Sequence, residues 1–163
     1  MTYRVCFVCT GNICRSPMAE IVFRARVAEA GLDGAVVVDS AGTGGWHEGE
    51  GADPRTETVL RANGYDTAHT ARRFDPSWFA RLDLVIALDS EHLTALRRLA
   101  PTERDADKVR LLRSYAPAAD DDLDVPDPYY GGADGFDECL EMVEAASTGL
   151  LAAVREQVEG QAA

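Results

Sequence analysis

The sequence predicts an α/β fold in which a parallel sheet is covered by helices on both faces. Short, wholly apolar runs of strand length recur along the chain, as expected of strands that are buried on both faces. Stretches with apolar residues at helical spacing lie between these runs. Neighbouring parallel strands need a helical crossover, so this alternation indicates a doubly covered sheet rather than a series of hairpins.

The first strand and helix are predicted between residues 5 and 31. The apolar run 5–8 is the first strand. Pro17 suits the first position of the helix, and Ser16, which the proline keeps out of helical geometry, suits its N-cap. The apolar stripe of this helix consists of Met18, Ile21, Val22 and Ala25. Gly31 is expected to end it.

The second strand and helix follow in the same order. The run 35–38 is the second strand, and it is expected to end in a glycine-rich loop over 40–46. Asp53 and Pro54 form a typical helix start, and Gly64 forms a typical helix end. This helix therefore occupies roughly the residues between them.

The second half of the chain continues the alternation. The apolar runs 84–88 and 109–112 predict the third and fourth strands, and Ser90 begins the helix between them. The leucines expected on the core face of that helix are Leu93, Leu96 and Leu99. Prolines and an acidic run make 114–132 a loop. A long final helix is marked by Phe136, Leu140, Val143, Leu150, Leu151 and Val154.

Length and charge limit the possible functions. The 163 residues are the size of one domain, which we expect to span 1–163. The net charge of −12 disfavours binding to nucleic acids or to membrane surfaces. No apolar run approaches the roughly 18 residues of a membrane helix, and the N-terminus lacks the apolar core of a signal peptide. A cytoplasmic location is therefore expected.

The charges and the cysteines are unevenly distributed. The segment between Arg113 and Arg155 has ten acids and no Lys or Arg, so the remaining 16 bases and 18 acids nearly balance. An anionic ligand could bind in that remainder. Of the four cysteines, Cys6, Cys9 and Cys14 lie within nine residues, which is no disulfide framework and suggests catalysis or metal binding. Cys6 and Cys139 are interpreted as packing residues.

The segment after the first strand has the pattern of a phosphate-binding loop. Cys9 ends the strand, five residues form a tight loop that includes Gly11 and Asn12, and Arg15 closes it. Backbone N–H groups of such a loop and the following helix N-terminus converge on an anion, and an arginine can bind two phosphate oxygens. The same groups favour the thiolate of Cys9. This predicts phosphoryl transfer through a phosphocysteine, rather than a merely buried cysteine and a surface arginine.

The loop 9–16 closely resembles that of the low-molecular-weight protein tyrosine phosphatases. Further motifs of that family stand in the family's order at 39–43, 69–72 and 127–130. The resemblance spans nearly the whole chain and implies a single phosphatase domain over 1–163. It also implies a four-stranded parallel sheet of order 2-1-3-4 in a flavodoxin-like three-layer sandwich, which agrees with the pattern above.

The resemblance also implies a role for each site residue. Cys9 would be the nucleophile, Arg15 the phosphate clamp, and Asp127 the acid that protonates the leaving group and then the base that activates water. The phosphate loop would consist of Thr10, Gly11, Asn12, Ile13, Cys14, Arg15 and Ser16. The network that supports it would consist of Asn12, Ser40, His69 and Ser16, with Ser16 bonded to the sulfur. The substrate cleft would be walled by Trp46, Tyr129 and Tyr130.

Several of these residues have an ordinary alternative. Asp127 lies among many acids and could be a solvated turn residue, and His69 could be an ordinary surface histidine. Asp89, at the end of the third strand, could lie near the site or only cap the next helix. His47 and His92 show no functional context and are expected at the surface.

Three less favoured functions share parts of this pattern. Arsenate reductases of this architecture need two further cysteines near the third strand, and none lies between Cys14 and Cys139. Phosphocysteine carriers need no acid such as Asp127. A phosphopeptide-binding module would be expected to lack Cys9, Arg15 or Asp127.

Arginine phosphatases of the same fold are the main alternative. They typically carry Thr where this chain has Ile13, and an aliphatic residue or Phe where it has the pair Tyr129 and Tyr130. Isoleucine packs against a flat ring, and the tyrosines suit stacking, so phosphotyrosine is the favoured substrate.

The expected partners are tyrosine-phosphorylated proteins, with inorganic phosphate or vanadate as inhibitors and the chain acting as a monomer. No cofactor and no metal are expected, because no cluster of residues has ligand spacing. Cys9 and Cys14 bracket a tightly curled loop, so their Cα atoms are expected within the disulfide limit of about 7 Å. Cys14 is therefore the predicted redox partner of Cys9.

Overall fold

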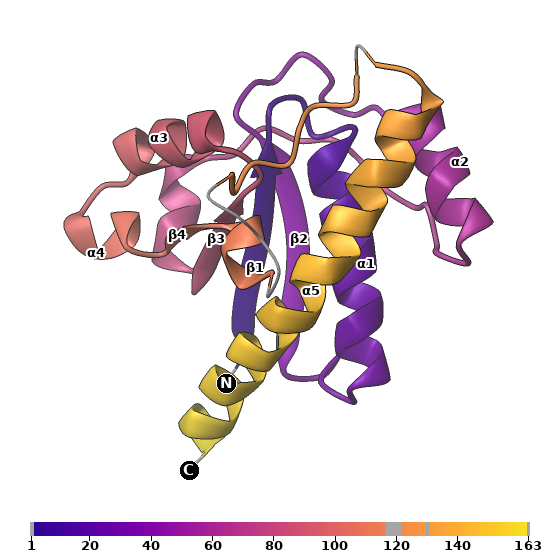
Figure 1. Ribbon diagram of the computed structural model, residues 1–163. Helices are drawn as coiled ribbons and strands as arrows, with labels where there is room; N and C mark the ends of the chain where they lie inside the picture. The colour runs from indigo at the N-terminus through magenta and orange to yellow at the C-terminus, as the bar shows by residue number, and fades with distance from the viewer. Residues whose placement is uncertain (1, 117–121, 130, 163) are drawn as a thin grey trace.

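Four parallel strands form the centre of the molecule in the order β2-β1-β3-β4. The computed structural model describes residues 2–116, 122–129 and 131–162. The strands are β1 (Tyr3–Cys9), β2 (Val36–Gly42), β3 (Leu84–Ala87) and β4 (Val109–Leu111). The predicted sheet and its strand order are confirmed (Figure 1).

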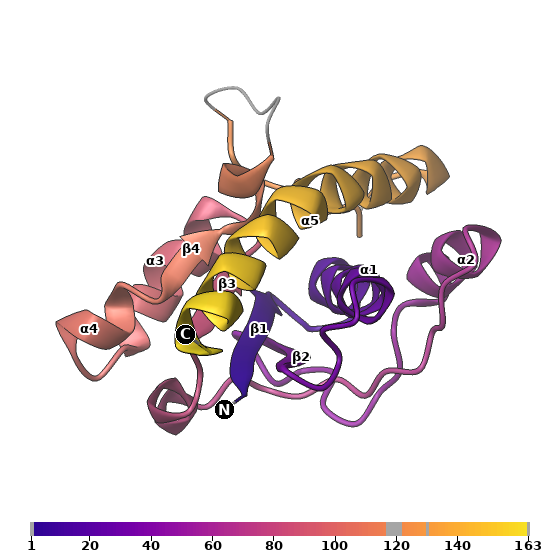
Figure 2. The same cartoon turned by 90° about the horizontal axis from the view of Figure 1, so that it is seen from below.

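Helices cover both faces of this sheet and make three layers (Figures 1 and 2). On one face lie α1 (Arg15–Glu29) and the long α5 (Ala133–Ala162), and on the other lie α3 (Ser90–Leu99) and the 3₁₀ helix η1 (Pro76–Ala80). The remaining helices are α2 (Pro54–Ala62), α4 (Glu103–Ala106) and the 3₁₀ helix η2 (Leu112–Tyr115). In the described part of the chain, no helix combines the length and the hydrophobicity that crossing a membrane requires.

The central strand β1 is buried on both faces, as its unbroken apolar run predicts. Val5 and Phe7 point into the core beneath α1 and α5. Cys6 and Val8 point into the core beneath α3 and η1. All four residues are fully buried, so alternate side chains of β1 pack into two apolar cores, one on each face of the sheet.

The helix boundaries test the capping signals. Asp53 caps α2 by accepting a hydrogen bond of 2.8 Å from the Arg55 N–H, and Gly64 follows the helix with a φ of 83°. The N-cap prediction for Ser16 is wrong. Helix α1 begins two residues earlier than predicted, at Arg15, and its N-cap Cys14 makes no side-chain capping bond. The hydroxyl of Ser16 is used instead in the site described below.

Other elements differ from the prediction at their ends. Strand β2 continues to Gly42, because Asp39 to Gly42 pair with Cys6 to Cys9 although the apolar run stops earlier. Strands β3 and β4 each end one residue sooner than predicted. Leu99 does not face the core and is 40% exposed. Helices η1 and α4 were not predicted, and η2 overlaps the start of the predicted loop 114–132.

Candidate active site

The loop after β1 opens onto a cavity of about 320 Å³ at the carboxyl ends of the strands. The loop contributes Cys9, Thr10, Gly11, Ile13, Cys14 and Arg15 to its lining. Four residues from later segments complete it: Trp46, His47, Asp127 and Tyr129. The predicted nucleophile, clamp, acid and part of the predicted cleft wall therefore meet in one cavity. Ligand sites of parallel sheets lie at this edge.

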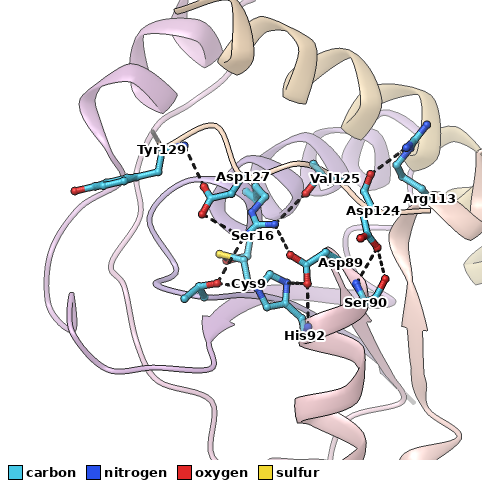
Figure 3. Close-up of polar contacts among 12 residues, drawn as sticks. Cys9, Ser16, Asp89, Ser90, His92, Arg113, Asp124, Val125, Asp127 and Tyr129 are labelled. Carbon is cyan, nitrogen blue, oxygen red and sulfur yellow. Dashed lines mark hydrogen bonds and ion pairs between the residues drawn. The ribbon is translucent and has the colours of Figure 1, made fainter. Parts of the chain in front are cut away.

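Cys9 lies at the end of β1 and is only 3% exposed. Its Sγ is 2.9 Å from the Oγ of Ser16, in the first turn of α1 (Figure 3). When the sulfur is ionised, only the hydroxyl can donate in this pair. The Ser16 hydroxyl therefore stabilises a thiolate, and the start of a helix adds a favourable dipole.

Asn12 connects the phosphate loop to the rest of the site. Its φ of 58° is in the left-handed region, which Asn tolerates better than most residues. Its amide nitrogen donates to Ser16 Oγ at 2.8 Å and to Ser40 Oγ at 2.9 Å. Its side-chain oxygen accepts from the Arg72 N–H at 2.9 Å, and its backbone carbonyl accepts from His69 Nε2 at 2.7 Å. All four predicted network residues are thus in one bonded cluster.

The buried side chains of Asn12 and Ser16 do not line the cavity, although both were predicted to bind phosphate. They lie behind the loop and hold its shape. One member of the network was missed altogether. Glu20 is 7% exposed, accepts a hydrogen bond from Ser40 Oγ and lies 3.9 Å from His69 Nδ1. A glutamate on a helix is normally solvated, so the sequence pattern carried no signal for it.

Arg15 is 3% exposed and is held from several sides. Its Nη1 donates to Asp89 Oδ2 at 2.7 Å and to the Val125 carbonyl at 2.9 Å. Its Nη2 lies 3.6 Å from Asp127 Oδ2. Burial lowers the pKa of Arg15, but the charges of Cys9, Asp89 and Asp127 outweigh it and raise the pKa above its usual value. A permanent cation therefore lies beside the sulfur.

Asp127 reaches the cavity on a segment that is fastened to the sheet. Val125 is fully buried and its N–H donates to the Leu88 carbonyl at 2.8 Å, directly after β3. Two residues later, the Asp127 side chain is 43% exposed, and its Oδ1 accepts from the Tyr129 N–H at 3.0 Å. The other carboxylate oxygen, Oδ2, faces Arg15, and Figure 3 shows Asp127 beside Tyr129. An accessible carboxyl group is thereby placed at the mouth of the cup.

Two glycines allow the loops around the cup to approach closely. A Cβ on Gly42 would lie 2.7 Å from the Thr10 carbonyl oxygen, so β2 could not pass the phosphate loop with any larger residue. A Cβ on Gly44 would lie 1.8 Å from the Trp46 ring. The glycine-rich loop therefore lets Trp46, which is 74% exposed, lie at the cavity as predicted.

Tyr129 also lines the cavity and is 37% exposed. The guanidinium of Arg55 lies 5.2 Å from its ring centroid, and donates to its backbone carbonyl at 2.9 Å. Arg55 also pairs with Asp53 at 3.0 Å, so the start of α2 holds this aromatic segment. Tyr130, the other predicted wall residue, lies outside the described residues.

Asp89 serves both of the roles that its position left open. Its Oδ1 caps α3 by accepting from the His92 N–H at 2.9 Å, while Oδ2 binds Arg15. Burial raises the pKa of Asp89, but these bonds outweigh it and hold the pKa below its usual value. Asp89 is therefore an ionised anchor for Arg15.

The surface prediction is wrong for His92, whereas His47 is partly exposed but also lines the cavity. His92 is 3% exposed, and its Nε2 lies 2.8 Å from Thr10 Oγ1. His47 is half-buried, lines the cavity and pairs with Glu50 at 2.6 Å. Both placements depend on loops that meet only in the folded chain. Cys6 and Cys139 are buried, as expected of packing residues.

The parallel sheet and the cysteine–arginine cup define the class, a phosphate-binding α/β enzyme with a thiol nucleophile. The family profile described as "Low molecular weight phosphotyrosine protein phosphatase" matches residues 4–160. The chain belongs to this family. The resemblance inferred from its motifs is thereby confirmed.

Proteins similar in sequence or in structure match nearly the whole chain. The chain is 80% identical, over 100% of both chains, to the "Low molecular weight protein-tyrosine-phosphatase" of Streptomyces coelicolor. A crystal structure of a protein tyrosine phosphatase from Entamoeba histolytica has a TM-score of 0.91 at 33% identity and covers 96% of this chain and 99% of that one. The Drosophila arginine phosphatase has a TM-score of 0.85 at 31% identity and covers 92% and 96%. The fold alone therefore does not separate the two substrate classes.

Proposed function

We propose that this chain is a protein tyrosine phosphatase that works through a phosphocysteine, as one catalytic domain over 1–163. The observation that carries the proposal is that Cys9, Arg15 and Asp127 line one cavity, with the Cys9 sulfur bonded to a hydroxyl. A nucleophile, a cation and an accessible carboxyl group are the three parts that phosphate ester hydrolysis requires.

In the first step the Cys9 thiolate attacks phosphorus, and the bond from phosphorus to the tyrosine oxygen breaks. Asp127 gives its proton to that oxygen, so tyrosine leaves as a neutral phenol. Arg15 and the N–H groups of the loop hold the phosphate oxygens through the transition state. The product of this step is a phosphocysteine.

In the second step Asp127 takes a proton from water, the water oxygen attacks phosphorus, and the phosphorus–sulfur bond breaks. The electron pair returns to Cys9, and the hydroxyl of Ser16 at 2.9 Å stabilises the thiolate that leaves. Inorganic phosphate is released. Phosphate and its analogue vanadate are therefore expected to compete with substrate.

Tyrosine-phosphorylated proteins are the proposed substrates, and a substitution at Ile13 tests this preference. Its aliphatic side chain lines the cavity together with the rings of Trp46 and Tyr129. We expect kcat/KM for a phosphotyrosine peptide to exceed that for the matching phosphoarginine peptide. The variant Ile13→Thr should narrow this ratio, because it removes apolar contact with the flat ring.

Steady-state kinetics on the two peptides check this prediction, with Ile21→Val as the control. Ile21 lies on α1 in the core, so it tests whether any loss of apolar bulk has the same effect. Preference for phosphoarginine by the unmodified chain would favour the arginine phosphatase instead. No turnover of any aryl phosphate would favour a phosphopeptide-binding module.

Peroxide is expected to inactivate the enzyme reversibly through a Cys9–Cys14 disulfide. Burial, followed by the charges of Asp53 and Cys9, raises the pKa of Cys14 to about 12, so Cys14 stays a thiol and oxidation begins at Cys9. Peroxide converts Cys9 to a sulfenic acid and is reduced to water. The Cys14 sulfur then attacks, a sulfur–sulfur bond forms and a second water leaves.

Mass spectrometry of the oxidised enzyme, before and after thiol reduction, measures this bond. Bound phosphate should slow the reaction, and Cys14→Ser should make the inactivation irreversible. Cys139→Ser is the matched control, since Cys139 is about equally buried but lies in the hydrophobic core and does not line the cavity. Reversible inactivation of Cys14→Ser would contradict the prediction.

The free thiols and the small cavity also bear on location and assembly. All four cysteines are unpaired, and a thiol that opens onto a cavity, as Cys9 does, stays reduced in a compartment with thiol reductants. We therefore propose that the enzyme works in the cytoplasm. The nucleophile, the cation and the acid of the proposed mechanism, Cys9, Arg15 and Asp127, can all line one cavity without a second copy, so we propose that a monomer is active.

A further inference from the structure

Four side chains form a ring behind the phosphate cup, joined by three hydrogen bonds and one close charge contact. Arg15 Nη1 donates to Asp89 Oδ2 at 2.7 Å, and Arg15 Nη2 donates to Thr10 Oγ1 at 3.5 Å. Thr10 Oγ1 lies 2.8 Å from His92 Nε2, and His92 Nδ1 lies 3.1 Å from Asp89 Oδ1. Asp89 and His92 are drawn in Figure 3. The mechanism above uses Arg15 but gives no role to His92.

Counting protons assigns a direction to this ring. Asp89 is an ionised acceptor, so the His92 Nδ1 that faces it carries the proton, although the contact lacks regular hydrogen-bond geometry. His92 Nε2 is then an acceptor, and it takes the single hydroxyl proton of Thr10. The Thr10 oxygen is left to accept from Arg15. Each of the four groups supports the next.

His92 can keep this arrangement because it remains neutral. Burial, and then the charge of Arg15, lower the pKa of His92 to about 4, although Asp89, Asp127 and Asp124 oppose the shift. A neutral imidazole offers one donor and one acceptor, as the ring requires. A protonated imidazole would offer two donors and would displace the Thr10 hydroxyl hydrogen.

We propose that His92 is a positioning residue of the phosphatase reaction, which holds Arg15 and the first loop residue, Thr10, in the geometry that binds phosphate oxygens. This inference rests on the proposed function and deepens it. His92 does not line the cavity, so we infer that it acts through its polar contacts with Thr10 and Asp89. Its own backbone N–H caps α3 through Asp89, and that bond does not depend on the imidazole.

Three variants separate positioning from simple packing. His92→Phe fills the same space without polar atoms. His92→Gln places an amide oxygen near the position of Nε2 and keeps an acceptor for Thr10. Thr10→Val replaces the hydroxyl of an exposed residue by a methyl group of similar shape, so it tests the same bond even where a change at the buried His92 prevents folding.

We expect kcat/KM for nitrophenyl phosphate to fall about 10- to 100-fold in His92→Phe and in Thr10→Val, as when an outer partner that orients a site residue is lost. The dissociation constant for inorganic phosphate, measured by calorimetry, should rise several-fold in both. His92→Gln should recover most of each loss. The double variant Thr10→Val with His92→Phe should be no worse than the poorer single variant, because both break the same bond.

A role in packing alone would reduce the amount of folded protein but leave the phosphate affinity of the folded fraction unchanged. The proposal is overturned if Thr10→Val binds phosphate as tightly as the unmodified chain. It is also overturned if Gln and Phe at position 92 behave alike. Calorimetry needs no turnover, so the phosphate affinities of the variants decide the role of His92 even if the proposed hydrolysis fails.

Discussion

Replacing Cys9 by serine is expected to abolish hydrolysis and to leave phosphate and vanadate binding largely intact. The serine hydroxyl is a far weaker nucleophile than the thiolate that Ser16 and Arg15 stabilise, so we expect a loss of at least about 10⁴-fold. Binding should persist because the loop N–H groups and Arg15 remain. Arg15 keeps its bonds to Asp89 and Val125, neither of which involves the sulfur.

Turnover of nitrophenyl phosphate and calorimetric titration with phosphate measure the two effects separately. Cys139→Ser is the control, since it removes a buried thiol that does not line the cavity. Activity should also survive EDTA: among residues 2–116, 122–129 and 131–162, no group of His, Cys, Asp and Glu side chains could hold a metal ion. Substantial turnover by Cys9→Ser, or complete loss with EDTA, would exclude the thiol mechanism.

Asp127→Asn is expected to slow phosphotyrosine cleavage more than nitrophenyl phosphate cleavage. The phenol of tyrosine has a pKa of about 10, so its oxygen leaves poorly without a proton, whereas nitrophenolate leaves readily. General-acid assistance typically raises a rate by about 10²–10⁴-fold. Asp127→Asn should therefore lower the cleavage rate mainly for phosphotyrosine, whose leaving group is the more basic. The carboxyl group is 43% exposed at the cavity, so asparagine fits its place.

Single-turnover rates are needed, because Asp127 also activates water in the second step. The pH profile of the unmodified enzyme should be bell-shaped, and its basic limb should disappear in Asp127→Asn. Asp137→Asn, an exposed acid on α5, is the matched control. If both substrates slow equally and the limb persists, the proton comes from another group. His47, which lines the cavity, would then be tested before Asp89, whose ion pair with Arg15 keeps it ionised.

Features encoded by neighbouring residues could be predicted from the sequence. The apolar run 5–8 and the Asp53–Pro54 start of α2 are local, and both were identified correctly. The position of the cup could also be predicted, because Cys9 and Arg15 stand at a fixed spacing between a strand and a helix, and both line the same cavity. Each of these features leaves a pattern in adjacent residues, so it can be recognised without knowledge of the distant contacts that complete it.

Features that depend on distant segments could not be predicted. Ser16 looked like a helix cap because proline follows it, but its hydroxyl is bonded to Cys9 and Asn12 instead. His92 and Glu20 belong to residue types that are usually exposed, and only the meeting of loops buries them. Tertiary context overrode residue-type expectation in each case. None of these three residues lines the cavity; they support the phosphate loop from behind.

The bond from Arg15 to the Val125 carbonyl joins residues 110 positions apart. Contacts so distant in sequence form late, because the chain must close a long loop before it gains from them. During synthesis the thiol loop leaves the ribosome long before residue 125 does. We therefore expect the nascent chain to lack phosphatase activity until the segment around Val125 has reached the sheet. On this view, the reactive thiol gains its phosphate clamp only after most of the chain has folded.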